Sequence, residues 1–64
     1  MNIEKSLRNL GLDVEVRKRK DRYIVTIKGE KASDLKILEN WAEVHGYEIK
    51  GMYPYGPNMM VEIR

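Results

Sequence analysis

Two glycines, Gly11 and Gly46, each separate a helical pattern of apolar residues from an alternating one, and this arrangement constrains the fold more than any other feature. Glycine readily adopts the left-handed conformation that closes many helices. Before the first glycine, Ile3, Leu7 and Leu10 fall on one face of a helix. The sequence therefore predicts two helices, each followed directly by a strand.

Capping residues support both helices. Asn2 is placed to accept a hydrogen bond from a free N–H in the first turn of the first helix. We expect the second helix from about 33 to 45, with Ser33 as its N-cap and Asp34 near the positive end of its dipole. Its apolar arc covers about half of the circumference, which suits packing against a sheet. The residues of this arc are Leu35, Ile37, Leu38, Trp41, Ala42 and Val44.

Alternation of apolar and polar residues predicts four strands. The segments LDVEVRK and RYIVTIK flank a short polar turn and indicate a hairpin. A third strand is expected at Tyr47 and Ile49, and the last strand carries Met59, Val61 and Ile63. Between them, MYPYGPN is rich in turn-forming residues, so we interpret it as the second hairpin turn.

The two halves can be laid over each other at the glycines, which gives two αββ units, residues 1–29 and 30–64, within a single domain of 64 residues. Duplication and chance similarity both explain this pattern. Neither unit could bury its own apolar face well. We therefore expect an α+β fold, a two-layer αββαββ sandwich with a four-stranded, mostly antiparallel sheet and both helices on one face.

Composition excludes several classes of protein. The chain has no cysteine, so a disulfide framework and a thiolate metal site are both excluded. No apolar run approaches the roughly 20 residues that cross a bilayer, and MNIEKSLRNL does not resemble a secretory signal. We expect a cytoplasmic location and no membrane partner. A net charge of +2 is too weak to identify a polyanionic partner by itself.

Groups suited to catalysis are sparse. His45 is the only histidine, and Ser6 and Ser33 are the only serines, whereas covalent catalysis usually needs a nucleophile, a base and an orienting group together. Glu39 and Glu43 lie one turn apart on the polar side of the second helix, where paired carboxylates are simply solvated. We predict a non-enzymatic protein with no catalytic residue, metal or cofactor.

A run of basic residues is the strongest functional signal. It comprises Arg17, Lys18, Arg19, Lys20 and Arg22. Such a run on a hairpin can contact several phosphates of DNA or RNA. Alternatively, it is a solvated tip whose lysines protect the sheet edge from aggregation. Asp13, Glu15 and Asp21 lie nearby and partly cancel the positive field.

Tyr53 and Tyr55 flank Pro54 in the second turn. Exposed there, they could stack on bases or anchor a protein partner; folded back, they would cover the end of the core. The pattern leaves open whether the two hairpin tips meet in one basic, aromatic patch or lie at opposite ends of the sheet.

The period of two also assigns side chains to the sheet face turned away from the helices. The residues assigned there are Asp13, Glu15, Arg17, Ile24, Thr26, Lys28, Glu48, Lys50, Met52, Met60, Glu62 and Arg64. No aromatic residue is among them, which disfavours the base-stacking mode of RNA-recognition sheets. Ile24, Met52 and Met60 instead suggest a surface for a homodimer or another protein, unless this face is merely solvated.

From Tyr23 onward, the layout resembles the TusA/SirA-like sulfur-carrier family. The resemblance rests on the strand YIVTIKG, the helix SDLKILENWAEVH and the tripeptide Gly46-Tyr47-Glu48, where that family often has Gly-His-Glu. It covers residues 23–64 and implies a related two-layer fold. The family's Cys-Pro-x-Pro motif is missing, so no catalytic residue is implied.

Three functions are therefore expected from the sequence. The first is a small basic module that binds nucleic acid through the basic run and through Tyr53 or Tyr55. The second is a protein-interaction or homodimerisation module that uses Ile24, Met52 and Met60. The third is a cysteine-free relative of a sulfur carrier.

Overall fold

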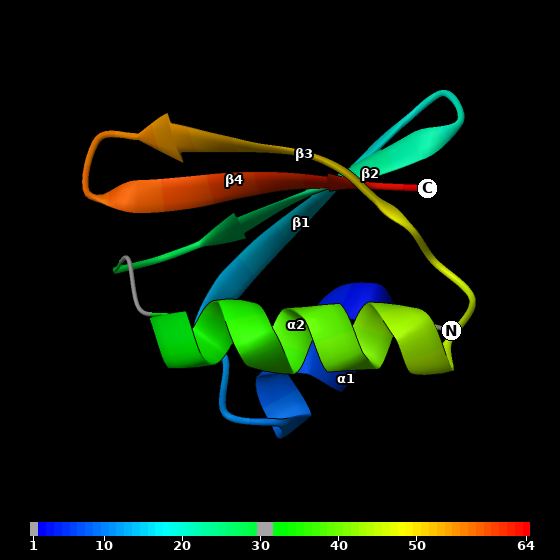
Figure 1. Cartoon of the computed structure of the whole chain (residues 1–64), viewed down its shortest axis with the longest axis horizontal. Coiled ribbons are helices and arrows are strands. Elements are labelled where there is room, and N and C mark those ends of the chain that lie inside the picture. The colour runs from blue at the N-terminus through cyan, green and yellow to red at the C-terminus, as the bar shows by residue number, and fades with distance from the viewer. Residues whose placement is uncertain (1, 30–31) are drawn as a thin grey trace.

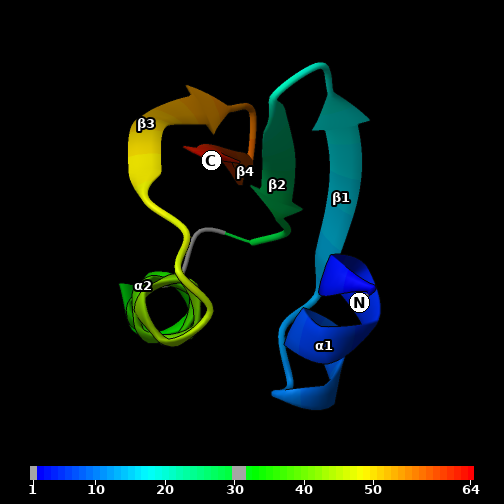
Figure 2. The ribbon, with the colours of Figure 1, turned by 90° about the vertical axis from the view of Figure 1, so that its right-hand side faces the viewer.

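The computed structural model describes residues 2–29 and 32–64 as two helices and one four-stranded sheet. In chain order the elements are α1 (Ile3–Asn9), β1 (Val14–Arg19), β2 (Arg22–Ile27), α2 (Ala32–Val44), β3 (Ile49–Tyr55) and β4 (Asn58–Ile63). The strands are ordered β1-β2-β4-β3, and all neighbours are antiparallel. Both helices lie beneath one face of the sheet (Figures 1 and 2), so the predicted α+β sandwich is confirmed.

Both helices end in the same hydrogen-bonding motif. Gly11 and Gly46 have φ angles of 91° and 78°. After α1, the N–H of Leu12 donates to the carbonyl of Leu7 at 3.3 Å; after α2, the N–H of Tyr47 donates to the carbonyl of Ala42 at 2.8 Å. These are the long bonds of Schellman motifs, which the left-handed glycine makes possible. At the other end of α1, Asn2 Oδ1 accepts from the Lys5 N–H at 3.0 Å, which confirms the predicted cap.

Three details predicted for the helices are wrong. Leu10 and Val44 are 50% and 81% exposed, because α1 ends at Asn9 and Val44 occupies the last helical position of α2, where the chain turns away. Ser33 is not an N-cap, since Ala32 before it is already helical. The predicted start of the second αββ unit, at residue 30, lies outside the described residues.

The core fills the space between the helices and the sheet. Its central side chains come from both hairpins, both helices and the connection between α1 and β1, and they are Ile3, Leu7, Leu12, Val14, Val25, Ile27, Leu38, Trp41, Ala42, Val61 and Ile63. Trp41 Nε1 of α2 donates to Ser6 Oγ of α1 at 2.9 Å, which ties the helices together. Trp41 also stacks on Tyr47, with ring centroids 5.5 Å apart. A buried indole N–H needs such a partner, so Ser6 has a structural role.

Strand β3 departs from the predicted alternation. Ile49 pairs with Ile63, but Gly51 pairs with the next residue along β4, Glu62, so β3 has one residue more than its partner and forms a β-bulge. After the bulge, Met52 lies opposite the fully buried Val61 and therefore on the helix side of the sheet. The prediction that Met52 lies on the outer face is wrong, because the bulge reverses the alternation from this point on.

The second hairpin turn is shorter than predicted. Strand β3 continues through Pro54 to Tyr55, so only Gly56 and Pro57 of MYPYGPN connect the strands. Proline is tolerated here because β3 is an edge strand. The two hairpin tips lie at opposite ends of the sheet (Figure 1), and the two tips therefore do not form a common patch.

Side chains of α1 cover part of the other sheet edge, formed by β1. Glu4 Oε1 accepts from the Val16 N–H at 2.9 Å, and Arg8 donates two hydrogen bonds to the Val14 carbonyl, from Nε at 3.1 Å and from Nη2 at 3.0 Å. An unpaired strand edge otherwise attracts further strands. Neither helix in the described ranges is long and apolar enough to cross a bilayer.

Candidate functional site

The outer face of the sheet, which is the face turned away from the helices, is hollowed into a groove of about 290 Å³. Residues from all four strands line the groove, so it forms only when the sheet is assembled. Its lining residues are Glu15, Arg17, Arg19, Ile24, Thr26, Lys28, Tyr55, Asn58 and Met60. Charged, aromatic and apolar side chains thus share one concave surface.

The bulge in β3 turns both tyrosines of this strand to the outer face. Tyr53 lies opposite Met60, and Tyr55 lies opposite Asn58. The rings are 53% and 62% exposed, so they do not fold over the end of the core. The prediction of an outer face without aromatic residues is wrong for the same reason as the prediction for Met52.

The two tyrosines have different surroundings. Tyr53 lies over Gly51, because a Cβ added to that glycine would be 2.5 Å from Tyr53 Oη. Aromatic rings often cover glycines in this way on a sheet. Tyr55, in contrast, lines the groove together with Arg17 and Arg19. Tyr55 is therefore the aromatic side chain that a ligand in the groove would meet.

The side chains of the basic run, residues 17–20 and 22, lie in different places on the first hairpin. Arg17 and Arg19 point into the outer groove, where they form no ion pair with any residue in 2–29 or 32–64. Lys18 alternates to the helix side and borders a second pocket. Lys20 occupies the tight turn of the first hairpin. Arg22 faces outward opposite Arg19, but its charge is engaged by Glu62. Only part of the run is therefore available at the groove.

Glu62 is a buried carboxylate on the outer face, at 8% exposure. Its Oε1 is 3.2 Å from Arg22 Nη1, and its Oε2 is 3.2 Å from Arg64 Nε. Arg64 Nη1 is also 3.6 Å from Asp21 Oδ2 in the first turn. Two half-exposed guanidinium groups thus neutralise Glu62, and Asp21 offsets part of their remaining charge. The other carboxylate at the groove, Glu15, is 3.3 Å from Lys28 Nζ.

Two of the three residues predicted as an interaction surface remain together. Ile24 and Met60 are half-buried neighbours on the floor of the groove, on the central strands β2 and β4. Met52 lies on the opposite face. The apolar area available to a second copy of the chain is therefore smaller than the sequence indicated, and it is bordered by arginine and tyrosine side chains.

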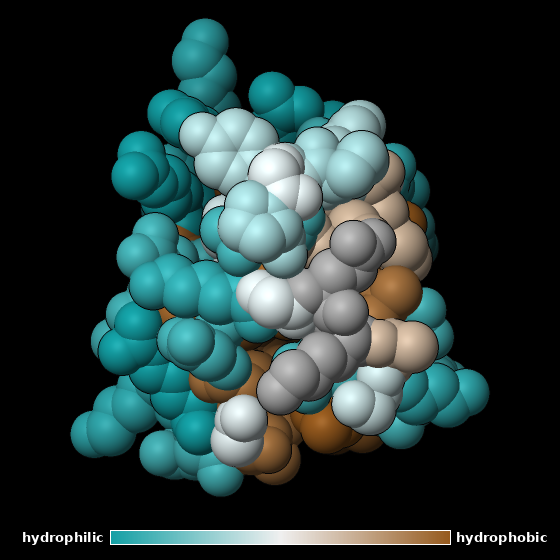
Figure 3. Space-filling view, turned by 90° about the vertical axis from the view of Figure 1, so that its left-hand side faces the viewer, coloured by the Kyte–Doolittle hydropathy of each residue, from teal (hydrophilic) through white to brown (hydrophobic). Residues whose placement is uncertain are grey.

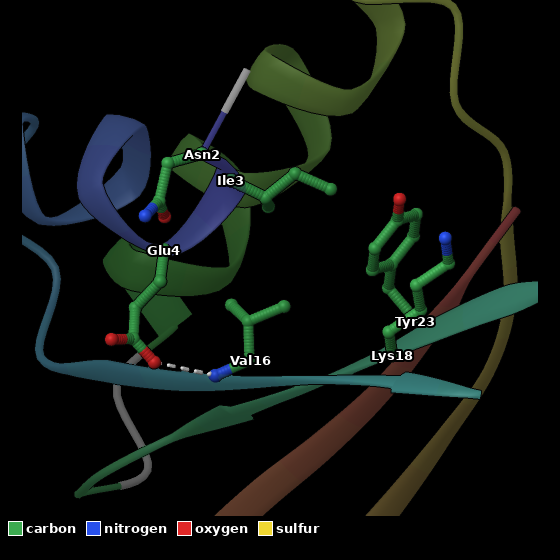
Figure 4. A pocket seen from close by; sticks show the side chains of 6 residues that line it. All are labelled: Asn2, Ile3, Glu4, Val16, Lys18 and Tyr23. Atoms are coloured by element: carbon green, nitrogen blue, oxygen red, sulfur yellow. Dashed lines mark hydrogen bonds between the residues drawn. The ribbon is translucent and has the colours of Figure 1, made fainter.

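A second, more open pocket of about 500 Å³ lies between α1 and the first hairpin. Figure 4 shows Asn2 and Glu4 at one end and Lys18 with Tyr23 at the other. Glu4 is already bonded to the Val16 N–H, so the polar groups that the pocket offers a ligand are chiefly those of Lys18 and Tyr23.

The residues considered for catalysis are not assembled into a site. Ser6 Oγ is bonded to Trp41, and the ring of His45 stacks on Trp41 at a centroid distance of 4.4 Å. Nδ1 of His45 lies 2.9 Å from the Trp41 carbonyl oxygen, to which a protonated Nδ1 donates. Glu39 and Glu43 are on α2, away from the groove. Within the part of the chain that the structure describes, no three acidic, histidine or cysteine residues gather to hold a metal ion.

Viewed from the end that carries the second hairpin turn, the surface is hydrophilic on one flank, whereas apolar surface appears on the other flank and below (Figure 3). Exposed Met52 and Val44 contribute apolar area outside the groove.

Sequence reasoning named Arg17, Arg19 and Tyr55 as candidate ligand-binding residues, but it did not predict that they share one face. It placed Thr26 and Lys28 on the outer face without a role in binding, and it placed Asn58 of the groove in the hairpin turn. The only local signal for the bulge is Gly51, a residue that interrupts the strand pattern and often marks irregular pairing.

No protein-family model matches the chain, and a search of the curated proteins finds none that is similar. The resemblance of residues 23–64 to the sulfur-carrier family thus stays a prediction.

Proposed function

We propose that this protein is a non-enzymatic module that binds nucleic acid through the outer face of its sheet. The observation that carries the proposal is the groove, which Arg17 and Arg19 line together with Tyr55. Guanidinium groups bind phosphates, and an exposed aromatic ring can stack on a base.

The charge balance of the groove supports a polyanionic partner. Three cations line it against one carboxylate; the cations are Arg17, Arg19 and Lys28, and the carboxylate is Glu15. The ion pair between Lys28 and Glu15 consumes some of this charge, but it leaves Arg17 and Arg19 available. Positive charge concentrated in a concave surface raises the local concentration of an anionic ligand.

Fluorescence anisotropy with labelled single- and double-stranded DNA and RNA at about 50 and 200 mM salt tests the proposal. Because phosphate contacts release counterions, affinity should fall steeply between these concentrations. In the variant R17Q/R19Q, the logarithmic dependence of affinity on salt should become less steep by about 1.5, as expected when two phosphate contacts are lost.

The variant K5Q/K36Q is a matched control. It removes the same charge from exposed lysines of α1 and α2, on the helix side of the molecule. It should bind like the unmodified protein. The proposal fails if no nucleic acid binds at the lower salt concentration, or if both double variants lose affinity equally.

Homodimerisation through the same face is a second candidate, favoured by the half-buried Ile24 and Met60 on the groove floor. Sedimentation at high protein concentration tests it. A monomer throughout excludes this candidate, whereas a dimer that nucleic acid dissociates would place both activities on one surface.

A further inference from the structure

We infer that the ligand of the outer face is a single strand, with its phosphates beside β1 and a base stacked on Tyr55. This inference rests on the proposed function and adds the form of nucleic acid and its placement. The observation behind it is that the arginines and the tyrosine of the groove lie on opposite edges of the sheet.

The unpaired cations and the aromatic rings lie on opposite edge strands. Arg17 and Arg19 belong to β1, whereas Tyr55 belongs to β3. Three strand spacings of about 4.8 Å place these edges roughly 14 Å apart, and Tyr55 lies four residues further along β3 than Gly51, which is in the same row as Arg17. A strand of several nucleotides whose backbone is held at β1 would therefore cross the sheet diagonally to place a base on Tyr55.

The surface between the two edges suits uncharged bases. Ile24 and Met60 provide an apolar floor, and Thr26 adds a hydroxyl group for hydrogen bonding. Glu15 and Glu62 each have a cationic partner, so neither carboxylate opposes the ligand with an uncompensated charge.

The size of the groove favours a single strand over a duplex. Its volume of about 290 Å³ lies just below the range for small-molecule sites, so it has room for one or two unpaired bases but not for a duplex. In a duplex the base faces are already stacked inside the helix, and Tyr55 could not reach them. Stacking on aromatic side chains is characteristic of proteins that bind single strands.

The structure also shows which of the two tyrosines is available to stack on a base. Tyr53 is committed to covering Gly51, whereas Tyr55 faces the groove. Tyr55 is thus the stacking residue, and Tyr53 is its matched control on the same strand.

The test compares three labelled ligands of equal length: a single-stranded oligonucleotide, its duplex, and an abasic phosphodiester chain. The unmodified protein should bind the single strand at least about tenfold more tightly than the abasic chain. Tyr55→Leu should weaken single-strand binding by about 5- to 100-fold and leave abasic binding unchanged, because only base stacking is lost. Tyr55→Phe should retain affinity, and Tyr53→Leu should have a smaller effect than Tyr55→Leu.

The outcomes separate the two proposals. If abasic chain or duplex binds as tightly as the single strand, and R17Q/R19Q weakens all three, the proposed function stands and the single-strand inference fails. The inference also fails if Tyr55→Leu weakens all ligands equally, or if Tyr55→Phe loses as much affinity as Tyr55→Leu. If none of the three ligands binds, the proposed function itself fails. Thermal unfolding of each variant confirms that the fold is retained.

Discussion

The two hairpins follow helices that end in the same Schellman motif, yet they present different chemistry to the outer face. In β1 the alternation is unbroken, so Val14 and Val16 face the helices and Arg17 and Arg19 face outward. In β3 the extra residue at the bulge moves Met52 to the helix side and turns Tyr53 outward. The difference shows that one inserted residue can decide whether an edge strand turns Met52 or its two tyrosines to the outer face.

We expect the largest loss of stability from substitutions in the core, and they test whether the two hairpins contribute equally to it. Ile27 of β2 and Ile63 of β4 are 1% and 0% exposed. Replacing either by alanine should lower the free energy of unfolding by about 2–5 kcal/mol, because a cavity forms. Urea denaturation measures this loss.

Met52→Ala is the control for this pair, since Met52 faces the helix side but is 41% exposed; it should cost no more than about 1 kcal/mol. If an alanine variant does not fold, Ile27→Val and Ile63→Val should each cost about 0.5–1.5 kcal/mol. Very different costs at the two positions would show that one hairpin dominates the core.

A smaller effect tests the shared helix ends. Gly11→Ala and Gly46→Ala should each destabilise the protein by about 1–2 kcal/mol, because both glycines have positive φ angles. No other atom lies within 4 Å of the added Cβ in either case, so the cost arises from the backbone alone. Thermal or chemical unfolding measures it. A loss at only one position would contradict the equivalence of the two motifs.

Disturbing the contact between Gly51 and Tyr53 in the second hairpin should lower the stability by a still smaller amount. Gly51→Ala should cost about 0.5–1.5 kcal/mol, since the Tyr53 ring must leave its preferred rotamer. In a Tyr53→Ala background the same change should cost less, and a double-mutant cycle measures the coupling. Additive costs would mean that the ring does not depend on the glycine.

The smallest effect concerns Glu48 and Lys50 beside the bulge. The hydrogen bond from Lys50 Nζ at 2.6 Å, and then its positive charge, lower the pKa of Glu48. A lowered pKa in the folded state stabilises the protein above the unfolded pKa of about 4.3, and this contribution is lost as the pH falls through the folded value. Lys50→Gln should raise the pKa of Glu48, as an NMR titration of the carboxyl carbon would show. An unchanged pKa would mean that Lys50 is not its cause.

The sequence predicted those parts of the fold that depend on neighbouring residues. Asn2, Gly11 and Gly46 act within one turn of a helix, so their roles could be assigned from the pattern alone. The alternation in the first hairpin likewise placed Val25 and Ile27 in the core. Each of these features is determined by residues that are close along the chain.

The candidate site was harder to predict because it depends on pairing between distant segments. The bulge exists only relative to β4, and the groove forms only when β2 and β4 are adjacent. Leu10 and Val44 continue the apolar patterns, but the geometry of the helix ends leaves them exposed. A pattern with a period of two or 3.6 contains no information about either effect.

The contacts of Glu4 and Arg8 with β1 have a consequence for how the chain behaves when it is shortened. These two side chains occupy the backbone groups that a neighbouring strand would otherwise use. Removing α1 would therefore expose a template for cross-molecule strand addition as well as the underside of the core. We therefore expect α1 to protect this sheet edge from pairing with strands of other molecules.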